Sequence, residues 1–171
     1  MPLNLISDQA LSDSDRAVFS SVKSIDGKHG KPLHKSFDCS IMDLADDIGF
    51  GVHDLEDALA LKLIRTDAFE HHVPPEACKP YLDLLKARYP EESGNDVYGG
   101  LINMLWGDGR ERKHAISRLV GYFVMNCAIE TIEELEEPLI RYRTDMSSEA
   151  KRFLEALKKL VYEEVIRSAA V

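Results

Sequence analysis

The chain has 171 residues, of which 44% are hydrophobic and 30% charged, and its formal net charge is −9. This length and composition predict a single globular domain with a substantial core. The negative charge argues against a nucleic-acid or anionic-membrane surface, because phosphate groups are bound by clustered positive charge. We expect a cytoplasmic protein, since the chain shows neither a signal-peptide pattern nor 18 uninterrupted apolar residues. Cys39, Cys78 and Cys127 are expected to be reduced thiols that act as small apolar filler.

The first 35 residues are predicted to form a unit of their own. Residues 8–24 predict a modest helix, and "IDGKHGKP" at 25–32 predicts a flexible connector because two glycines and a proline interrupt it. The predicted division is therefore residues 1–35 as helix and connector, and residues 36–171 as a helical domain.

Residues 36–64 carry the clearest helical pattern. Ser36 is the predicted N-cap. Apolar residues then recur at intervals of three and four, which predicts an amphipathic helix ending near Ile64: Phe37, Ile41, Leu44, Ile48, Val52, Leu55 and Leu59.

Further helices are predicted along the rest of the domain. They cover "DAFEHH" after Thr66, the proline-led stretch 74–90, and residues 95–106 and 109–131 on either side of "GDG". Residues 133–145 read as irregular or briefly extended, and Ser147 or Ser148 starts a last helix. Because no alternating strand pattern competes, the predicted fold is all-α, a compact multi-helix bundle.

One face of the helix at 36–64 is acidic. At about 100° per residue, the face opposite the apolar stripe holds Asp46, Phe50, His53, Asp54 and Asp57. A solvated surface would explain this pattern. Two features favour a binding face instead: glycines at 49 and 51 inside a helix, which permit close approach of another group, and an aromatic ring among carboxylates.

The segment "LADDIGFGVHDLEDALALKLI" at 44–64 resembles the HD-superfamily deoxyguanosine triphosphate triphosphohydrolases (dGTPases). The family pattern is an Asp, an aromatic residue four positions on, a second Asp eight positions on, and then "LED". Here these are Asp46, Phe50 and Asp54, and "KPLHKSFDCSIM" resembles the approach to that helix in one bacterial branch. The resemblance implies that Asp46 is the last protein ligand of a divalent metal, and that Phe50 and Asp54 hold the deoxyribose. Phe50 replaces the usual tyrosine, so any hydrogen bond from that phenol is absent.

The same family takes its other metal ligands from an upstream His and a separate His-Asp pair. Upstream of Asp46 this chain has only His29 and His34, and the doublet His53-Asp54 lies downstream on the same helix. We therefore expect the C-terminal part of a longer enzyme, inactive alone and holding manganese, magnesium or iron tightly only when complete. No general acid or base is assigned in this chain.

Basic residues gather in "GDGRERKHAISR" at 107–118. Arg110, His114 and Arg118 are spaced to line one helical face. A solvated first turn of a core helix would explain the pattern, and a triphosphate-binding face is the functional alternative. Related mammalian dNTPases have Arg-x-x-x-His-x-x-x-Tyr, which Arg110 and His114 match and Arg118 does not.

These observations predict part of a metal-dependent dNTP triphosphohydrolase, acting on dGTP or another dNTP and expected to form homo-oligomers. The alternative is a non-catalytic helical module for interaction, oligomerisation or regulation. Regulation through single-stranded DNA would require a local basic patch.

Overall fold

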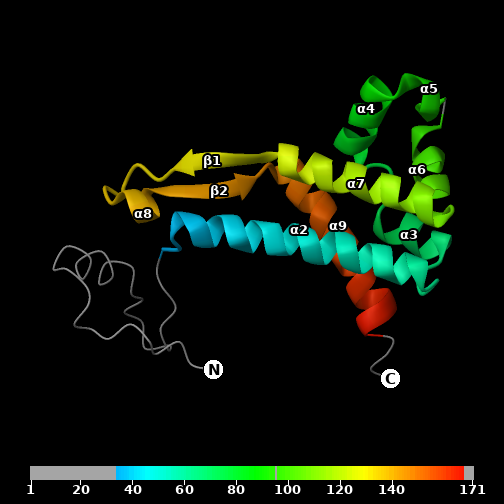
Figure 1. Ribbon diagram of the computed structural model, residues 1–171, viewed down its shortest axis with the longest axis horizontal. Helices are drawn as coiled ribbons and strands as arrows, with labels where there is room; N and C mark the ends of the chain where they lie inside the picture. Colours follow the sequence, from blue (N-terminus) through cyan, green and yellow to red (C-terminus); the bar gives the residue numbers. More distant parts are fainter. Residues whose placement is uncertain (1–33, 95, 168–171) are drawn as a thin grey trace. The chain divides into compact units, whose positions relative to one another are not determined.

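Helices dominate the computed structural model, which describes residues 34–94 and 96–167 (Figure 1). The predicted helix at 8–24 and the connector at 25–32 lie outside the described residues. The all-α prediction is confirmed, with the addition of a small two-stranded sheet. The elements in chain order are α2 (Phe37–Ala60), α3 (Thr66–His72), α4 (Lys79–Arg88), α5 (Pro90–Ser93), α6 (Val97–Trp106), α7 (Gly109–Met125), β1 (Cys127–Thr131), α8 (Pro138–Arg141), β2 (Tyr142–Met146), α9 (Ser148–Val161) and the π-helix η1 (Tyr162–Ile166).

The described residues divide into two compact units. Unit 1 comprises residues 34–41 and 129–144, and unit 2 comprises 42–94, 96–128 and 145–167. Helix α2 and both strands contribute residues to each unit. None of the helices in the described ranges is long and apolar enough to cross a membrane.

Helix α2 begins as predicted and ends earlier than predicted. The Ser36 hydroxyl accepts a hydrogen bond from the Cys39 amide at 3.3 Å, as expected of an N-cap. The helix ends at Ala60 because Lys62 adopts a left-handed backbone, φ 57°. The amide of Leu63 then donates to the Ala58 carbonyl at 2.8 Å, and that of Lys62 to the Leu59 carbonyl at 3.1 Å. These two bonds form a Schellman motif, in which lysine takes the place usually held by glycine.

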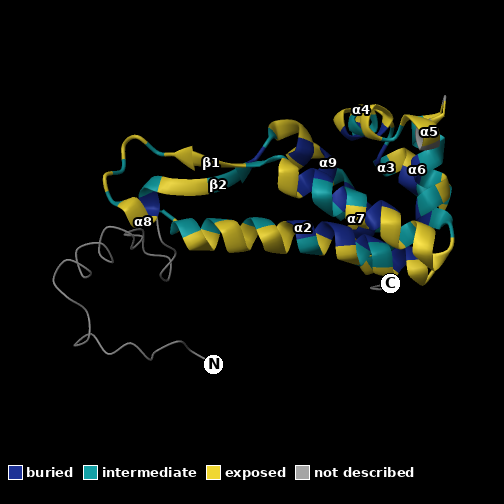
Figure 2. Ribbon diagram, turned by 45° about the horizontal axis from the view of Figure 1, so that its top comes forward, coloured by how far each residue is buried: buried dark blue, intermediate teal, exposed yellow. Residues whose placement is uncertain are grey.

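The core of unit 2 is built around α9. Ser147 caps this helix, accepting a hydrogen bond from the Ala150 amide at 3.4 Å. The predicted apolar stripe is buried at Phe153, Leu154, Leu157, Leu160 and Val161. Its aromatic centre joins α4, α7 and α9 through ring contacts of 5.1 to 6.1 Å among Tyr81, Tyr122, Phe123 and Phe153. Burial deepens along α2 in the same unit, where the second half of the helix carries most of the buried positions (Figure 2).

Helix α9 reaches α2 at a glycine. A Cβ atom on Gly51 would lie 2.6 Å from Leu154 Cδ1 and 3.2 Å from Lys158 Cγ, so only glycine fits the present packing. A Cβ on Gly49 would meet no heavy atom within 4 Å. The predicted close approach therefore holds for Gly51, and the approaching group is the neighbouring helix.

The prediction that residues 109–131 are helical throughout was wrong, whereas β2 overlaps the stretch 133–145 that was predicted to be irregular or briefly extended. Helix α7 ends at Met125, and β1 pairs antiparallel with β2 (Figure 1). The Ile132 amide donates to the Arg141 carbonyl at 2.7 Å, and Arg143 forms an ion pair with Glu130 at 2.8 Å. Because almost every side chain of β1 is exposed, the strand has no apolar alternation that the sequence could reveal.

The three cysteines are free thiols in different surroundings. Cys78 is buried, as predicted for apolar filler, whereas Cys39 is exposed and Cys127 is half-buried. The filler prediction was therefore wrong for Cys39, because the first turns of α2 are largely open to solvent.

Candidate functional site

The acidic face of α2 points to solvent, as the helical pattern predicted. Asp46, His53 and Asp57 are exposed, Asp54 is half-buried, and the Phe50 ring remains 42% exposed. The opposite face, with Ile48, Val52, Leu55 and Leu59, is buried. An exposed aromatic ring between carboxylates gives the helix a surface that is both apolar and acidic.

The Asp47 carboxylate of α2 is neutralised by a contact to another helix. Asp47 forms an ion pair with Lys158 of α9 at 3.0 Å, and Lys158 also pairs with Glu155 at 2.9 Å. Burial of Lys158 opposes its charged form, but the hydrogen bonds to Glu155 and Asp47 outweigh that effect and raise the pKa of Lys158. Within residues 34–94 and 96–167, the side chains of Asp46 and Asp54 form no ion pair.

Asp46 suits a divalent cation chemically, since hard cations prefer carboxylate oxygen, but it is a single donor. Among the residues that the structure describes, no group of three His, Cys, Asp or Glu side chains could hold a metal ion. The neighbouring His53 is directed to Glu56, with Nδ1 and Oε2 4.0 Å apart. The described residues therefore do not form a metal site by themselves.

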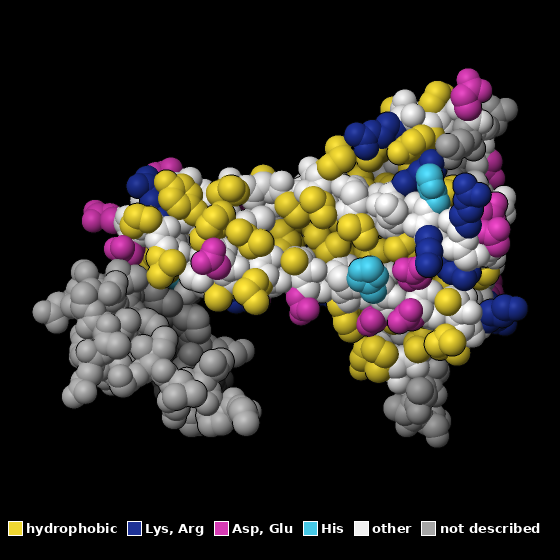
Figure 3. All heavy atoms as spheres, viewed as in Figure 1, with side chains coloured by type: hydrophobic (Ala, Val, Ile, Leu, Met, Phe, Trp, Pro, Cys, Tyr) yellow, Lys and Arg dark blue, Asp and Glu magenta, His cyan; other side chains and the backbone are white. Residues whose placement is uncertain are grey.

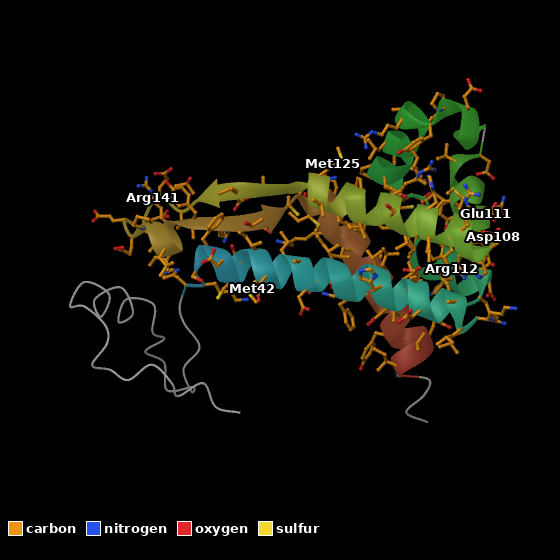
Figure 4. All side chains as sticks on the ribbon, in the orientation of Figure 1. Met42, Asp108, Glu111, Arg112, Met125 and Arg141 are labelled. Atoms are coloured by element: carbon orange, nitrogen blue, oxygen red, sulfur yellow. The ribbon has the colours of Figure 1, made fainter. Side chains whose placement is uncertain are left out.

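The basic segment forms the start of α7. Asp108 is its N-cap: one carboxylate oxygen accepts hydrogen bonds from the amides of Arg110 and Glu111, each at 2.8 Å. Glu111 completes a capping box by accepting from the Asp108 amide at 3.1 Å. These amide bonds lower the pKa of Asp108. Figure 4 shows Asp108, Glu111 and Arg112 together at this end of the helix.

The structure brings Arg110 and His114 together at a groove between α6 and α7. The groove has a volume of about 630 Å³, and α4 closes one side. Lys, Arg and His side chains gather over this part of the molecule in the space-filling view (Figure 3). Its lining comprises Leu85, Val97, Gly100, Leu101, Met104, Asp108, Arg110, Glu111, His114 and Arg118. The two carboxylates in this lining, Asp108 and Glu111, accept backbone hydrogen bonds of the helix cap. An anion in the groove would therefore be bound by the basic side chains of the lining.

Arg118 also lines the groove and is held by aromatic and sulfur contacts. Its guanidinium carbon lies 3.8 Å above the centre of the Tyr89 ring, and Nη1 lies 3.7 Å from the Met104 sulfur. Such stacking holds the flat face of a guanidinium group against the face of an aromatic ring. The sequence places Arg118 in line with Arg110 and His114, but only the fold shows that Tyr89 supports it.

The two predicted groups of site residues occupy separate features. Asp46, Phe50 and Asp54 lie on α2, whereas the groove takes its lining from α4, α6, α7 and the turn before α7. The chain is thus a mainly helical domain that presents an acidic helix face and a groove lined by arginine and histidine.

Comparison with known proteins identifies the relatives of this domain. No family model matches the chain. A deoxyguanosinetriphosphate triphosphohydrolase-like protein of Shewanella halifaxensis is 32% identical over 164 residues, which is 95% of this chain and 35% of that protein. A protein of the same name from Haemophilus influenzae is 35% identical over 92% of this chain and 33% of its own length. For a deoxyguanosinetriphosphate triphosphohydrolase-like protein 2 of Deinococcus radiodurans, the identity is 33% over 82% of this chain.

The chain spans about a third of the length of the curated relatives it matches. It is therefore homologous to about a third of a deoxyguanosinetriphosphate triphosphohydrolase-like protein, and this confirms the resemblance predicted from residues 44–64.

Proposed function

We propose that this chain supplies part of the active site of a metal-dependent dNTP triphosphohydrolase. The reaction is the hydrolysis of dGTP, or another dNTP, to a deoxynucleoside and triphosphate. The supporting observation is the identity of 32–35% over 92–95% of the chain to proteins named for that activity. Because the chain spans only a third of them, the proposal assigns the activity to a longer protein and none to this chain alone.

In this proposal Asp46 gives one carboxylate ligand to a divalent cation, manganese, magnesium or iron. A cation bound there would polarise a phosphoryl oxygen and lower the pKa of a bound water. The exposure of Asp46 supports this role, because a further set of ligands can approach it.

The remaining residues bind and orient the substrate. The Phe50 ring packs under the deoxyribose, and the Asp54 carboxylate accepts a hydrogen bond from the sugar 3′-hydroxyl, so that both contribute orientation. Arg110 and His114 neutralise the triphosphate. The shared groove that holds Arg110 and His114 supports their acting together. No residue of this chain is assigned as general acid or base.

The test is a chimera in which this chain replaces the matching third of the Haemophilus influenzae relative. Release of nucleoside and triphosphate from each dNTP is measured with manganese, beside this chain alone. We expect activity from the chimera only, and a loss of at least about 100-fold for Asp46→Ala, since even outer-shell partners of metal ligands contribute 10- to 100-fold. Asp47→Ala is the matched control, expected to keep activity because its carboxylate pairs with Lys158. An active chimera whose rate is unaffected by Asp46→Ala would refute the role of Asp46, and an inactive folded chimera would refute the hydrolase proposal.

A non-catalytic helical module for interaction or oligomerisation is the second candidate. The favouring observation is that unit 1 exposes large apolar side chains, with Ile129 65% exposed, Leu139 47%, Ile41 43% and Tyr142 40%. Light scattering with Ile129→Asp separates the candidates: the module predicts self-association that this variant abolishes, and indifference to Asp46→Ala.

A further inference from the structure

The hairpin of β1 and β2 has one covered edge and one open edge. On the outer side of β2, the Thr144 amide donates a hydrogen bond at 2.9 Å to the hydroxyl of Ser40, near the start of α2. In Figure 1, β2 accordingly runs between β1 and the first turn of α2. On the outer side of β1 no third strand pairs within residues 34–94 and 96–167, where the sheet consists of β1 and β2. The described part of the chain therefore leaves the backbone of β1 available at that edge.

The register of the hairpin shows which residues of β1 bond to β2. The Ile132 amide donates to the Arg141 carbonyl at 2.7 Å, and two residues further along each strand Glu130 pairs with Arg143 at 2.8 Å. These contacts set Ile132 opposite Arg141 and Glu130 opposite Arg143. In antiparallel strands the hydrogen bonds join alternate residues, so the backbone groups of residues 128 and 130 in β1 face β2.

The other residues of β1 direct their backbone groups to the open edge. By the same alternation, the amides and carbonyls of residues 127, 129 and 131 face away from β2. The outward hydrogen bond of Thr144, which this register sets opposite Ile129, agrees with that assignment. A free strand edge is a template for pairing with another strand, and protein edges are commonly protected by lysine or proline. The sequence of β1, CAIET, contains neither residue.

Exposed apolar side chains accompany the open edge. Almost every side chain of β1 is exposed (Figure 2), and Ile129 at its centre is 65% exposed. The register sets Tyr142 of β2 on the same face of the hairpin, where its ring is 40% exposed. A strand pairing with β1 would thus cover apolar surface in addition to satisfying backbone groups.

A second copy of β1 complements this edge. With a two-fold axis at Ile129, antiparallel pairing sets each Ile129 opposite that of the second copy, and residue 127 opposite residue 131. These are the residues whose backbone groups face outward, so they form the hydrogen-bonded pairs. On the other face, Ala128 lies opposite Glu130 of the second copy, and no like charges meet. All five residues of β1 are paired in this arrangement, which brings together two β-branched side chains at its centre.

We propose that β1 pairs edge to edge with β1 of a second copy of this chain, so that two hairpins form one four-stranded antiparallel sheet. The interface is isologous, because the same strand serves both copies. This dimer is compatible with either candidate function and does not depend on hydrolysis. The response to Asp46→Ala, and not the presence of the dimer, therefore separates those two candidates.

The test is analytical ultracentrifugation of the full chain over a wide range of concentrations, where we expect a monomer–dimer equilibrium. Thr131→Pro removes an outward amide while keeping those that face β2, a position at which an edge strand tolerates proline. Each dimer then loses two hydrogen bonds, so the dissociation constant should rise about tenfold or more. Leu139→Ser is the matched control: it removes an apolar side chain that is 47% exposed and lies outside β1, and it should leave the equilibrium unchanged. Circular dichroism confirms that both variants remain folded.

Charge at position 128 tests the register. Ala128→Glu sets two carboxylates opposite each other at both ends of the pairing and should weaken the dimer several-fold, whereas Ala128→Lys should not weaken it, because lysine would lie opposite Glu130 of the second copy. A chain that stays monomeric at every concentration overturns the proposal, as does a dimer that neither Thr131→Pro nor Ala128→Glu weakens. Protection of the Ile129 amide from hydrogen exchange in a monomeric chimera would also overturn it and would assign the edge to the remainder of the longer protein.

Discussion

Replacing Gly51 by alanine should destabilise the protein, although alanine is the better helix former. In an open helix interior the exchange stabilises by up to about 1 kcal/mol. At this position the new methyl would lie 2.6 Å from Leu154 Cδ1, and Leu154 is only 3% exposed. Overpacking of a buried site costs about 1–3 kcal/mol. We therefore expect a net loss of about 1 kcal/mol for Gly51→Ala.

The matched control lies two residues earlier on the same helix. Gly49→Ala places its methyl in open space and should stabilise by about 0.5–1 kcal/mol. Urea unfolding followed by circular dichroism measures both free energies of unfolding. The combination with Leu154→Ala tests the cause, because the truncated side chain removes the clash and should make Gly51→Ala favourable in that background. Equal stabilisation by both alanines would refute the close approach of α9 to α2.

Three further predictions concern charge and thiol chemistry. Lys158→Met should lower the free energy of unfolding by about 0.5–1 kcal/mol at pH 7. The pKa of Lys158 is raised in the folded state. The contribution of its charge to the free energy of unfolding is therefore complete below the ordinary pKa of 10.5 and is lost as the pH rises through the pKa of the folded state. Urea titrations at pH 7 and 11 would detect this loss. Asp108→Ala should destabilise more than Asp108→Asn, because asparagine keeps an oxygen that accepts the amide hydrogen bonds. Since the pKa of Asp108 is lowered in the folded state, the stabilising contribution of its charge is complete above the ordinary value of 3.8 and is lost as the pH falls through the lower folded value, which acid unfolding curves would detect. Cys39 should react rapidly with a thiol reagent at pH 8, while Cys78, buried and with its pKa raised to about 12, should react only on unfolding, and equal rates in the native protein would contradict this.

Local signals account for the parts of the fold that the sequence predicted. Ser36 and Ser147 carry hydroxyls that suit an N-cap, and the stripes after them have the helical period. The end of α2 was missed because its left-handed residue is Lys62, which has no glycine signature. Strand β1 was missed because pairing with residues 142–146, and not apolar alternation, defines it.

In the candidate site, too, the features that follow from local spacing were predicted and those that follow from tertiary packing were not. Helical spacing alone predicted that Arg110 and His114 share a surface, and they line one groove. The support of Arg118 in α7 depends instead on the ring of Tyr89, the residue that follows α4. These residues are about 30 positions apart in the chain, and no periodic pattern links them. Contacts of this kind follow from tertiary packing, so the sequence contained the residues without indicating their meeting.

Consecutive carboxylates on α2 show how the fold separates structure from function. Successive helical residues point about 100° apart, so Asp47 reaches Lys158 of α9 and its neighbour Asp46 does not, although both residues are exposed. The ion pair of Asp47 contributes to the packing of two helices, whereas Asp46 makes no ion pair anywhere in residues 34–94 and 96–167. Like charges at adjacent positions repel, so the second charge does not stabilise this part of α2. An exposed carboxylate without an ion pair, beside an exposed aromatic ring, is consistent with the proposed role of Asp46 as a cation ligand, because the packing of α2 does not require its charge.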